Sequence, residues 1–196
     1  MPNWCNNTIT IEHKDSAKIN EVVKSLTTKI NDDTDESLFF TYCKPEPDYS
    51  KTKVKATFPE ISNKEYEEDI DRKWWDWRVQ NWGTKWNIGV LDEDRITVKD
   101  NTVIFNCETA WSPPLEALTE LENKGFEIEC DYYEGGCAFI GRYSTGAEKI
   151  SWDLPETLAE LKDMMNRNET FKDLAESWGV DIDYEQMESE EEDERA

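Results

Sequence analysis

The chain has 196 residues and a formal net charge of −23, with acidic residues in excess in both the body and the last quarter. This length suits one domain with additions better than two full domains. A field of that sign repels phosphate backbones and anionic membranes, because polyanion binding depends on Lys and Arg. We therefore expect no membrane partner and no direct nucleic-acid binding. The acidity either only keeps the protein soluble or engages basic sites on another protein.

The five cysteines form an odd set with no C-x-x-C spacing. Neither a disulfide framework nor a zinc or iron–sulfur ligand set is indicated, so we predict no metal site and no cofactor. The N-terminal sequence lacks a basic region followed by an apolar run, and no stretch approaches the ~18 apolar residues of a membrane span. We expect a cytoplasmic protein with reduced thiols.

The first elements are a strand and a helix. Residues 4–12 end in an alternation of Ile and Thr, which predicts a half-buried strand. Asp15 or Ser16 is placed to cap a helix, because apolar residues then recur at helical spacing. Two prolines interrupt the segment that follows, and residues 31–71 are the least predictable part of the chain.

A second helix is predicted over residues 65–82. It ends at Gly83, the residue type that tolerates the left-handed conformation common just past a helix. Alternation of apolar and polar residues over 86–90 then predicts a short strand.

A hairpin is predicted around a two-residue turn at 100–101. With that turn, Val98 lies opposite Val103 and Ile96 lies opposite Phe105. Both pairs are apolar and lie on the same face, so turn and strands agree on one register.

A third helix is predicted over residues 112–125. Ser112 is placed to cap it, Pro113 suits the first helical position, where its missing N–H costs nothing, and Gly125 ends it.

The C-terminal part begins with two further strands. Residues 126–132 alternate between apolar and acidic side chains, and the turn "EGG" leads into a strand over 137–143. Two short helices are predicted within 155–178. The like-charge run over 185–196 is predicted to be disordered.

In order, these elements are strand, helix, insertion, strand, strand, helix, strand and one added strand. This is the split βαβ order of a ferredoxin-like α+β sandwich, in which helices cover one face of an antiparallel sheet. We predict a ferredoxin-like domain over residues 1–147, with an insertion at about 31–94. A helical acidic extension over 148–184 and the tail over 185–196 follow it.

Four sequence blocks carry a resemblance to a known family. They are "MPNWCNN" at the start, "NWGTKWN" at 81–87, "TAWSPP" at 109–114 and "EGGCAFIG" at 134–141. Together they resemble the YubB-type ferredoxin-like domain family of small proteins encoded by bacteriophages and conjugative plasmids. The resemblance implies a ferredoxin-like fold and a mobile-element origin, with the cytoplasm of a host cell as the location.

The resemblance implies neither an iron–sulfur cluster nor an assigned enzymatic activity. This chain has Asn87 where the block that it resembles usually ends in an acidic residue. That departure argues against a charged catalytic or metal-binding role at position 87.

Five of the nine tryptophans lie in "RKWWDWRVQNWGTKWN", residues 72–87. In one interpretation the indoles fill the space between the insertion and the sheet. In the other they form an aromatic groove for a peptide, a base or a nucleoside, with Arg78 and Lys85 as cations. Arg78 lies between two stripes of the helix, where it can stack on indole or pair with a carboxylate. The candidates here are Trp74, Trp77, Arg78, Asn81, Trp82, Lys85 and Trp86.

The block "TAWSPP" ends a predicted strand and starts a helix. It adds Thr109, Trp111 and Ser112 to the candidates, since hydroxyls beside unpaired N–H groups can bind anions. The two prolines remove two of those donors, however, which favours a purely structural helix cap.

The sequence shows no side chains in a spacing that is typical of a catalytic site, and we name no catalytic residue. His13 is the only histidine and lies in a polar setting that is typical of a surface residue. Glu127, Glu129 and Asp131 line one face of a strand. They form either solvated exterior or an acidic binding surface.

Two function classes therefore remain open, and enzymatic activity is not expected under the first. The first is a non-enzymatic phage or plasmid accessory protein that binds a host protein through an acidic, aromatic-bearing surface, in host takeover or counter-defence. The second is a protein that binds a small ligand or nucleotide, or an unrecognised enzyme, at the Trp-rich insertion and "TAWSPP". Direct nucleic-acid binding is disfavoured, because the strand "VIFNCETAW" lacks the basic and Gly-rich aromatic pattern of an RRM platform.

Overall fold

A six-stranded antiparallel sheet forms the centre of the computed structural model, which describes residues 3–56 and 70–194. The strand order is β2-β3-β1-β4-β5-β6. The first four strands have the order and directions of a ferredoxin-like sheet, which confirms the predicted fold. The strands are β1 (Trp4–Glu12), β2 (Ile96–Lys99), β3 (Thr102–Ala110), β4 (Glu127–Glu134), β5 (Phe139–Ser144) and β6 (Ile150–Asp153).

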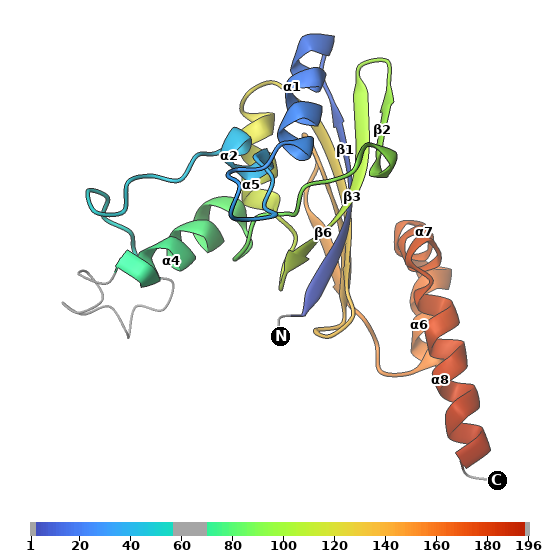
Figure 1. Cartoon of the computed structure of the whole chain (residues 1–196). Coiled ribbons are helices and arrows are strands. Elements are labelled where there is room, and N and C mark those ends of the chain that lie inside the picture. Colours follow the sequence, from blue (N-terminus) through green and yellow to red (C-terminus); the bar gives the residue numbers. More distant parts are fainter. Residues whose placement is uncertain (1–2, 57–69, 195–196) are drawn as a thin grey trace.

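Helices pack on both faces of this sheet (Figure 1). Those before β4 lie on one face, and the C-terminal three stand on the other. The helices are α1 (Ser16–Thr27), α2 (Phe39–Cys43), α4 (Ile70–Trp82), the short 3-10 helix η2 (Glu93–Arg95), α5 (Leu115–Glu122), α6 (Leu158–Arg167), α7 (Glu169–Trp178) and α8 (Val180–Glu194).

Several local predictions are confirmed. Asp15 caps α1, since its carboxylate accepts a hydrogen bond from the backbone N–H of Ala17 at 2.9 Å. The hairpin has the predicted register, with Val98 opposite Val103. Gly83 follows α4 with φ of +82°, as its predicted role as a helix stop requires. The part of that helix predicted for residues 65–69 lies outside the described residues.

Other local predictions are wrong. Residues 86–90 form no strand and contribute only an isolated bridge between Glu36 and Gly89, because buried Asn87 uses its side chain to bond the backbone there. Pro114 rather than Ser112 precedes α5, so Pro113 is not its first residue.

Two C-terminal predictions also need correction. The segment predicted to begin a helical extension instead adds the strand β6, whose four residues are too few to reveal an alternation. The run predicted to be disordered continues α8 as far as Glu194. Glutamate has a favourable intrinsic helix propensity, which here outweighs repulsion between like charges.

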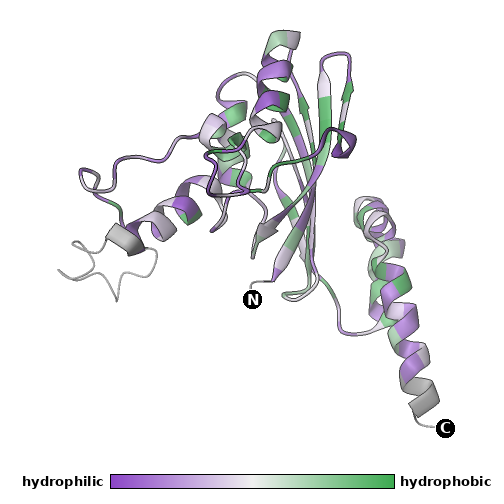
Figure 2. Cartoon of the chain, in the orientation of Figure 1, coloured by the Kyte–Doolittle hydropathy of each residue, from purple (hydrophilic) through white to green (hydrophobic). Residues whose placement is uncertain are grey.

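The two faces of the sheet carry separate cores. Tyr132 belongs to the core shared with α1, α2, α4 and α5, whereas its neighbour Tyr133 packs against α6–α8. Successive residues of a strand point to opposite faces, so β4 contributes to both cores. Figure 2 shows this alternation along the strands, in contrast to the mainly hydrophilic segment 44–56 that follows α2.

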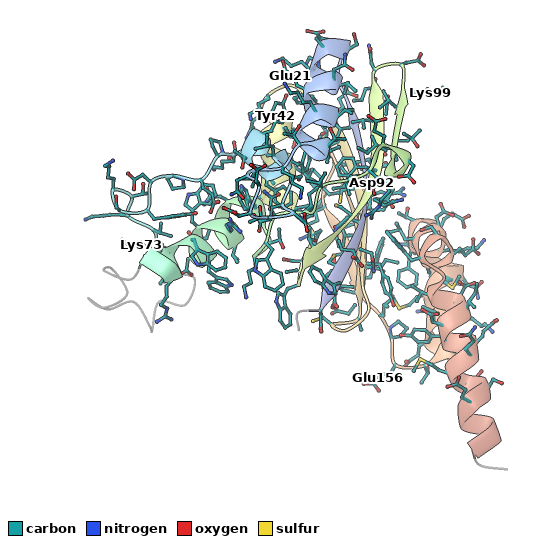
Figure 3. The ribbon with its side chains drawn as sticks, viewed as in Figure 1. Glu21, Tyr42, Lys73, Asp92, Lys99 and Glu156 are labelled. Carbon is teal, nitrogen blue, oxygen red and sulfur yellow. The ribbon has the colours of Figure 1, made fainter. Side chains whose placement is uncertain are left out.

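The insertion is tied to the domain by hydrogen bonds as well as by packing. The Tyr42 hydroxyl donates to Glu21 at 3.0 Å, which joins α2 to α1 (Figure 3). The guanidinium of Arg78 on α4 donates two hydrogen bonds of 2.9 Å to the Glu46 carboxylate. Burial alone would raise the pKa of Glu46, but the hydrogen bonds from Arg78 and Tyr49 outweigh it, so this pKa is lowered.

We predict that Glu46→Gln lowers the free energy of unfolding at pH 7 by about 1–3 kcal/mol, because it leaves the mostly buried Arg78 guanidinium without a bidentate partner. A carboxyl with a lowered folded-state pKa stabilises the fold above its ordinary value near 4.5. That contribution is lost as the pH falls through the lowered pKa. Urea denaturation of both proteins across this range measures the effect.

The matched control is Glu188→Gln, which removes the same charge from an exposed position on α8. It is expected to change the free energy of unfolding by less than about 0.5 kcal/mol at every pH. If the difference in the free energy of unfolding between wild type and Glu46→Gln stays constant into the acid range, the assigned role of the ion pair is contradicted.

Candidate functional site

The four sequence blocks meet at one end of the sheet. Antiparallel pairing places the start of β1 beside the end of β3, with Trp4 opposite Ala110. The same pairing places Cys5 opposite Glu134 at the end of β4, and Glu134 opposite Phe139 at the start of β5. The segment after α4 joins them from the insertion. Blocks far apart in the sequence therefore form one rim, on which the candidate site lies.

The segment after α4 is fixed to this rim through backbone groups. The Thr84 hydroxyl donates to the carbonyl of Ala110 and accepts from its N–H, both at 3.0 Å. The Ser112 hydroxyl donates to the carbonyl of Gly83. A Cβ on Gly83 would lie 3.0 Å from the carbonyl oxygen of Pro113, which is too close for ordinary packing. Glycine is thus required both by its positive φ and by the close approach of the two chains.

Trp111 has an unusual backbone at the end of β3. Its φ is +73°, a conformation that is strained for a bulky side chain, and the residue is 50% exposed. The Trp111 N–H donates to the carbonyl of Asn3 at 3.0 Å. The packing of a half-exposed indole does little to offset the free energy of a strained backbone. Strain that is retained without such packing is typical of functional sites.

An open groove of about 520 Å³ lies beside Trp111. Its walls come from α4, from the segment after it and from the end of β3. The lining residues are Trp75, Val79, Thr84, Lys85, Ala110, Trp111 and Ser112. The hydroxyls of Thr84 and Ser112 already bond the backbone of Ala110 and Gly83, and we call this contact between the segment after α4 and the end of β3 the joint. The groove therefore offers mainly indole and aliphatic surface.

Further indole surface adjoins the groove. The ammonium of Lys85 lies 4.5 Å from the ring centre of Trp86, and Trp86 lies 5.9 Å from the ring of Trp4. Trp4 is 45% exposed. We call Trp4, Trp75, Trp86 and Trp111 the indole rim.

Hydrogen-bond donors remain available here. Within residues 3–56 and 70–194, neither the Lys85 ammonium nor the indole N–H of Trp111 has a hydrogen-bond partner. The carboxylate of Glu116 reaches the position of Gly83, where an added Cβ would lie 2.1 Å from its Oε2. The ammonium of Lys85 and the indole N–H of Trp111 are therefore free donors beside the groove, with the Glu116 carboxylate nearby.

The rest of the tryptophan segment is structural. Trp82 is fully buried and its indole N–H donates to the carbonyl of Lys44 at 2.9 Å, while Trp77 is 8% exposed. Arg78 stacks over Trp74 at 5.2 Å and over Trp82 at 4.8 Å, in addition to its pair with Glu46. This is the position between two stripes that the helical spacing predicted.

The amides and hydroxyls near the rim are also used internally. The side-chain N–H group of Asn81 donates to the carbonyl of Trp77 at 2.8 Å. Thr109 is buried, donates to the carbonyl of Ser112 at 2.7 Å and accepts from Asn7 at 2.9 Å. These two candidates hold the rim in place rather than face a ligand.

The acidic candidates on β4 lie on the opposite face of the sheet from α1. Glu127 and Glu129 are exposed and line a shallow groove with Glu12, whereas Asp131 is paired with Arg142 through hydrogen bonds of 2.5 and 2.6 Å. Glu127 lies opposite Glu12 and Glu129 opposite Thr10, toward the other end of β1 from Trp4, so the structure separates these two residues from the indole rim.

The thiols and the histidine form no reactive constellation. Burial raises the pKa of Cys107 to about 12 and also raises the pKa of Cys5, so both thiols stay protonated at neutral pH. His13 packs its ring 4.8 Å from Phe126. Within the part of the chain that the structure describes, no group of His, Cys, Asp and Glu could hold a metal ion. None of the helices described there is long and apolar enough to cross a membrane.

Residues 81–173 match the family model of the ferredoxin-like domain in Api92-like protein. The match begins at the end of α4 and includes three of the four blocks, β6, α6 and the start of α7. It supports the ferredoxin-like fold, and it names Api92-like proteins rather than the YubB-type family. No curated protein and no solved structure matches the chain.

Sequence reasoning missed two residues of the rim. Trp4 and Trp75 were not among the candidates, although Trp75 lies in the tryptophan segment itself. For Trp4 the available signal is the strand period: the next residue, Cys5, is fully buried, so Trp4 points to the other face. No sequence signal places Trp75 beside Trp111, because that contact depends on the joint at Gly83.

We predict that Trp111→Gly is more stable than Trp111→Ala by about 1 kcal/mol, because a left-handed backbone penalises any Cβ. Both substitutions remove the indole, so the comparison isolates the backbone. Chemical denaturation measures it. An equal or greater stability of Trp111→Ala would show that residue 111 does not hold a positive φ.

Proposed function

We propose that this chain is a non-enzymatic interaction protein that binds a protein partner through the indole rim. The observation that carries the proposal is the exposure of Trp111 and Trp4 on a rim held by backbone hydrogen bonds. Tryptophan is the residue type most enriched in binding hot spots. Solvent-exposed indoles on a rigid frame bury much surface on binding and lose little side-chain entropy.

The sequence resemblance suggests the biological setting. The four blocks resemble the YubB-type family of phages and conjugative plasmids, so the proposed partner is a host protein in the cytoplasm, and the proposed role is host takeover or counter-defence. A net charge of −23 favours a partner with a basic surface. The exposed carboxylates of Glu127 and Glu129 and those of α8 contribute to that field.

The groove supports a second candidate function. Its volume of about 520 Å³ lies within the range of small-ligand sites. A planar ligand such as a nucleoside would stack on Trp75 or Trp111 and accept a hydrogen bond from Lys85. This hypothesis ranks lower, because Lys85 is the only cation among the described residues that line the groove, and the overall charge repels a phosphate.

Affinity capture from host lysate tests the first proposal. Full-length protein is expected to retain a partner, and Trp111→Gly is expected to reduce its recovery about tenfold or more, as loss of a hot spot requires. The control Ile182→Ala removes apolar surface from an exposed position on α8 and should leave recovery unchanged. Equal recovery with wild type and Trp111→Gly, or no partner from several hosts, would contradict the proposal.

A further inference from the structure

The groove beside Trp111 combines features that fit one class of peptide. Its surface is formed mainly by indole rings and aliphatic groups, and its free polar side-chain groups are donors. From this combination we infer that the groove binds a proline-rich segment in the polyproline II conformation, with a basic residue beside the prolines. This inference rests on the proposed function, because it names the chemistry of the partner that the indole rim binds.

The polar groups of the groove decide between proline and other residues. The hydroxyls of Thr84 and Ser112 are already bonded to backbone, and the groove lining offers the ammonium of Lys85 and the indole N–H of Trp111 as free donors. A proline residue has a carbonyl acceptor and no N–H donor. A run of prolines can therefore accept from both groups without leaving an N–H of its own unpaired.

The apolar surface supports the same conclusion. Polyproline II segments pack their rings into grooves lined by aromatic side chains, and they lose little entropy because the conformation is already formed in the free peptide. Trp75 and Trp111 stand on two different elements, α4 and the end of β3, and both line the groove. Their separation is set by the rigid joint between Thr84 and Ala110, so the groove does not have to be ordered on binding.

Charge complementarity predicts a basic residue beside the prolines of the bound peptide. The carboxylate of Glu116 lies against Gly83, next to the groove, and has no ion-pair partner among the residues that the structure describes. An Arg or Lys beside the proline run would pair with Glu116, and the net charge of −23 would attract it from a distance. A phosphate or an acidic peptide lacks both advantages.

The test uses full-length protein and two synthetic peptides of equal length and charge. One is a run of prolines with an arginine at each end, and in the other alternating alanine and glutamine replace the prolines. Calorimetry gives the affinities, and the indole N–H resonance of Trp111, assigned with Trp111→Gly, gives the site. We expect the proline peptide to bind at least tenfold more tightly than the other and to shift the Trp111 resonance. The resonance of buried Trp82 should stay in place.

Two variants and their controls sharpen this test. Trp111→Gly, which the positive φ tolerates, should weaken binding about tenfold or more, whereas Ile182→Ala should not. Glu116→Lys should weaken it severalfold more than Glu188→Lys, which makes the same change of net charge on α8. If Glu116→Lys and Glu188→Lys lose the same amount of peptide affinity, the proposed contact between Glu116 and the basic residue of the peptide is overturned.

The outcomes separate this inference from the function on which it rests. Equal binding of the two peptides, both dependent on Trp111, would overturn the preference for proline while protein binding stands. Capture from lysate that depends on Trp111, with no shift from either peptide, would likewise overturn the inference alone. A nucleoside that shifts the Trp111 resonance when the proline peptide does not would overturn it in favour of a small ligand. Loss of Trp111 dependence in the capture experiment would remove the proposed function itself.

Discussion

Two hydrogen bonds between the Thr84 hydroxyl and the backbone of Ala110 join the insertion to the central sheet. They bring Gly83 so close to Pro113 that a side chain at residue 83 has no room. This contact places α4 beside the end of β3 and thereby places Trp75 beside Trp111. The groove, the indole rim and the proposed binding activity all depend on it.

The tryptophans of the chain serve two different purposes within a short distance. Trp77 and Trp82 fill the core, where the indole N–H of Trp82 is satisfied by a backbone carbonyl. Trp4 and Trp111 instead keep about half of their surface in solvent. The core indoles secure the frame, and the exposed side chains of Trp4 and Trp111 are the surface that we propose for binding. The interpretation of the tryptophan segment as packing between the insertion and the sheet is therefore confirmed for Trp77 and Trp82, whereas binding by the indole rim stays a proposal.

The sequence predicted those parts of the fold that depend on local patterns. Strand alternation, the Asp15 cap and the register of the hairpin at Val98 and Val103 are set by neighbouring residues, and the element order then fixed the ferredoxin-like topology. The strand β6 and the position of α6–α8 on the second face depend on tertiary packing, with Phe171 and Ile140 in a core of their own. No periodicity within a single segment indicates which face of a sheet that segment will cover.

The candidate site was predictable only in part, for the same reason. Lys85, Trp86 and Trp111 were identified because their blocks stand out in the sequence. The roles of Arg78 and Thr109 became clear only from their partners, Glu46 and Asn7, which are distant in the chain. Serine is a residue type that often caps helices, but the Ser112 hydroxyl donates to the carbonyl of Gly83 instead, because the chain after α4 lies within its reach.

The division of the tryptophans into core and rim is the central claim, and hydrogen exchange of the assigned indole N–H groups tests it most directly. The N–H of Trp82 is predicted to exchange only through global unfolding, since the side chain is fully buried and bonded to Lys44. The N–H of Trp111 is predicted to exchange at close to the rate of a free indole. Protection of Trp111 comparable to that of Trp82 would show that the rim is closed in solution, and it would contradict the account.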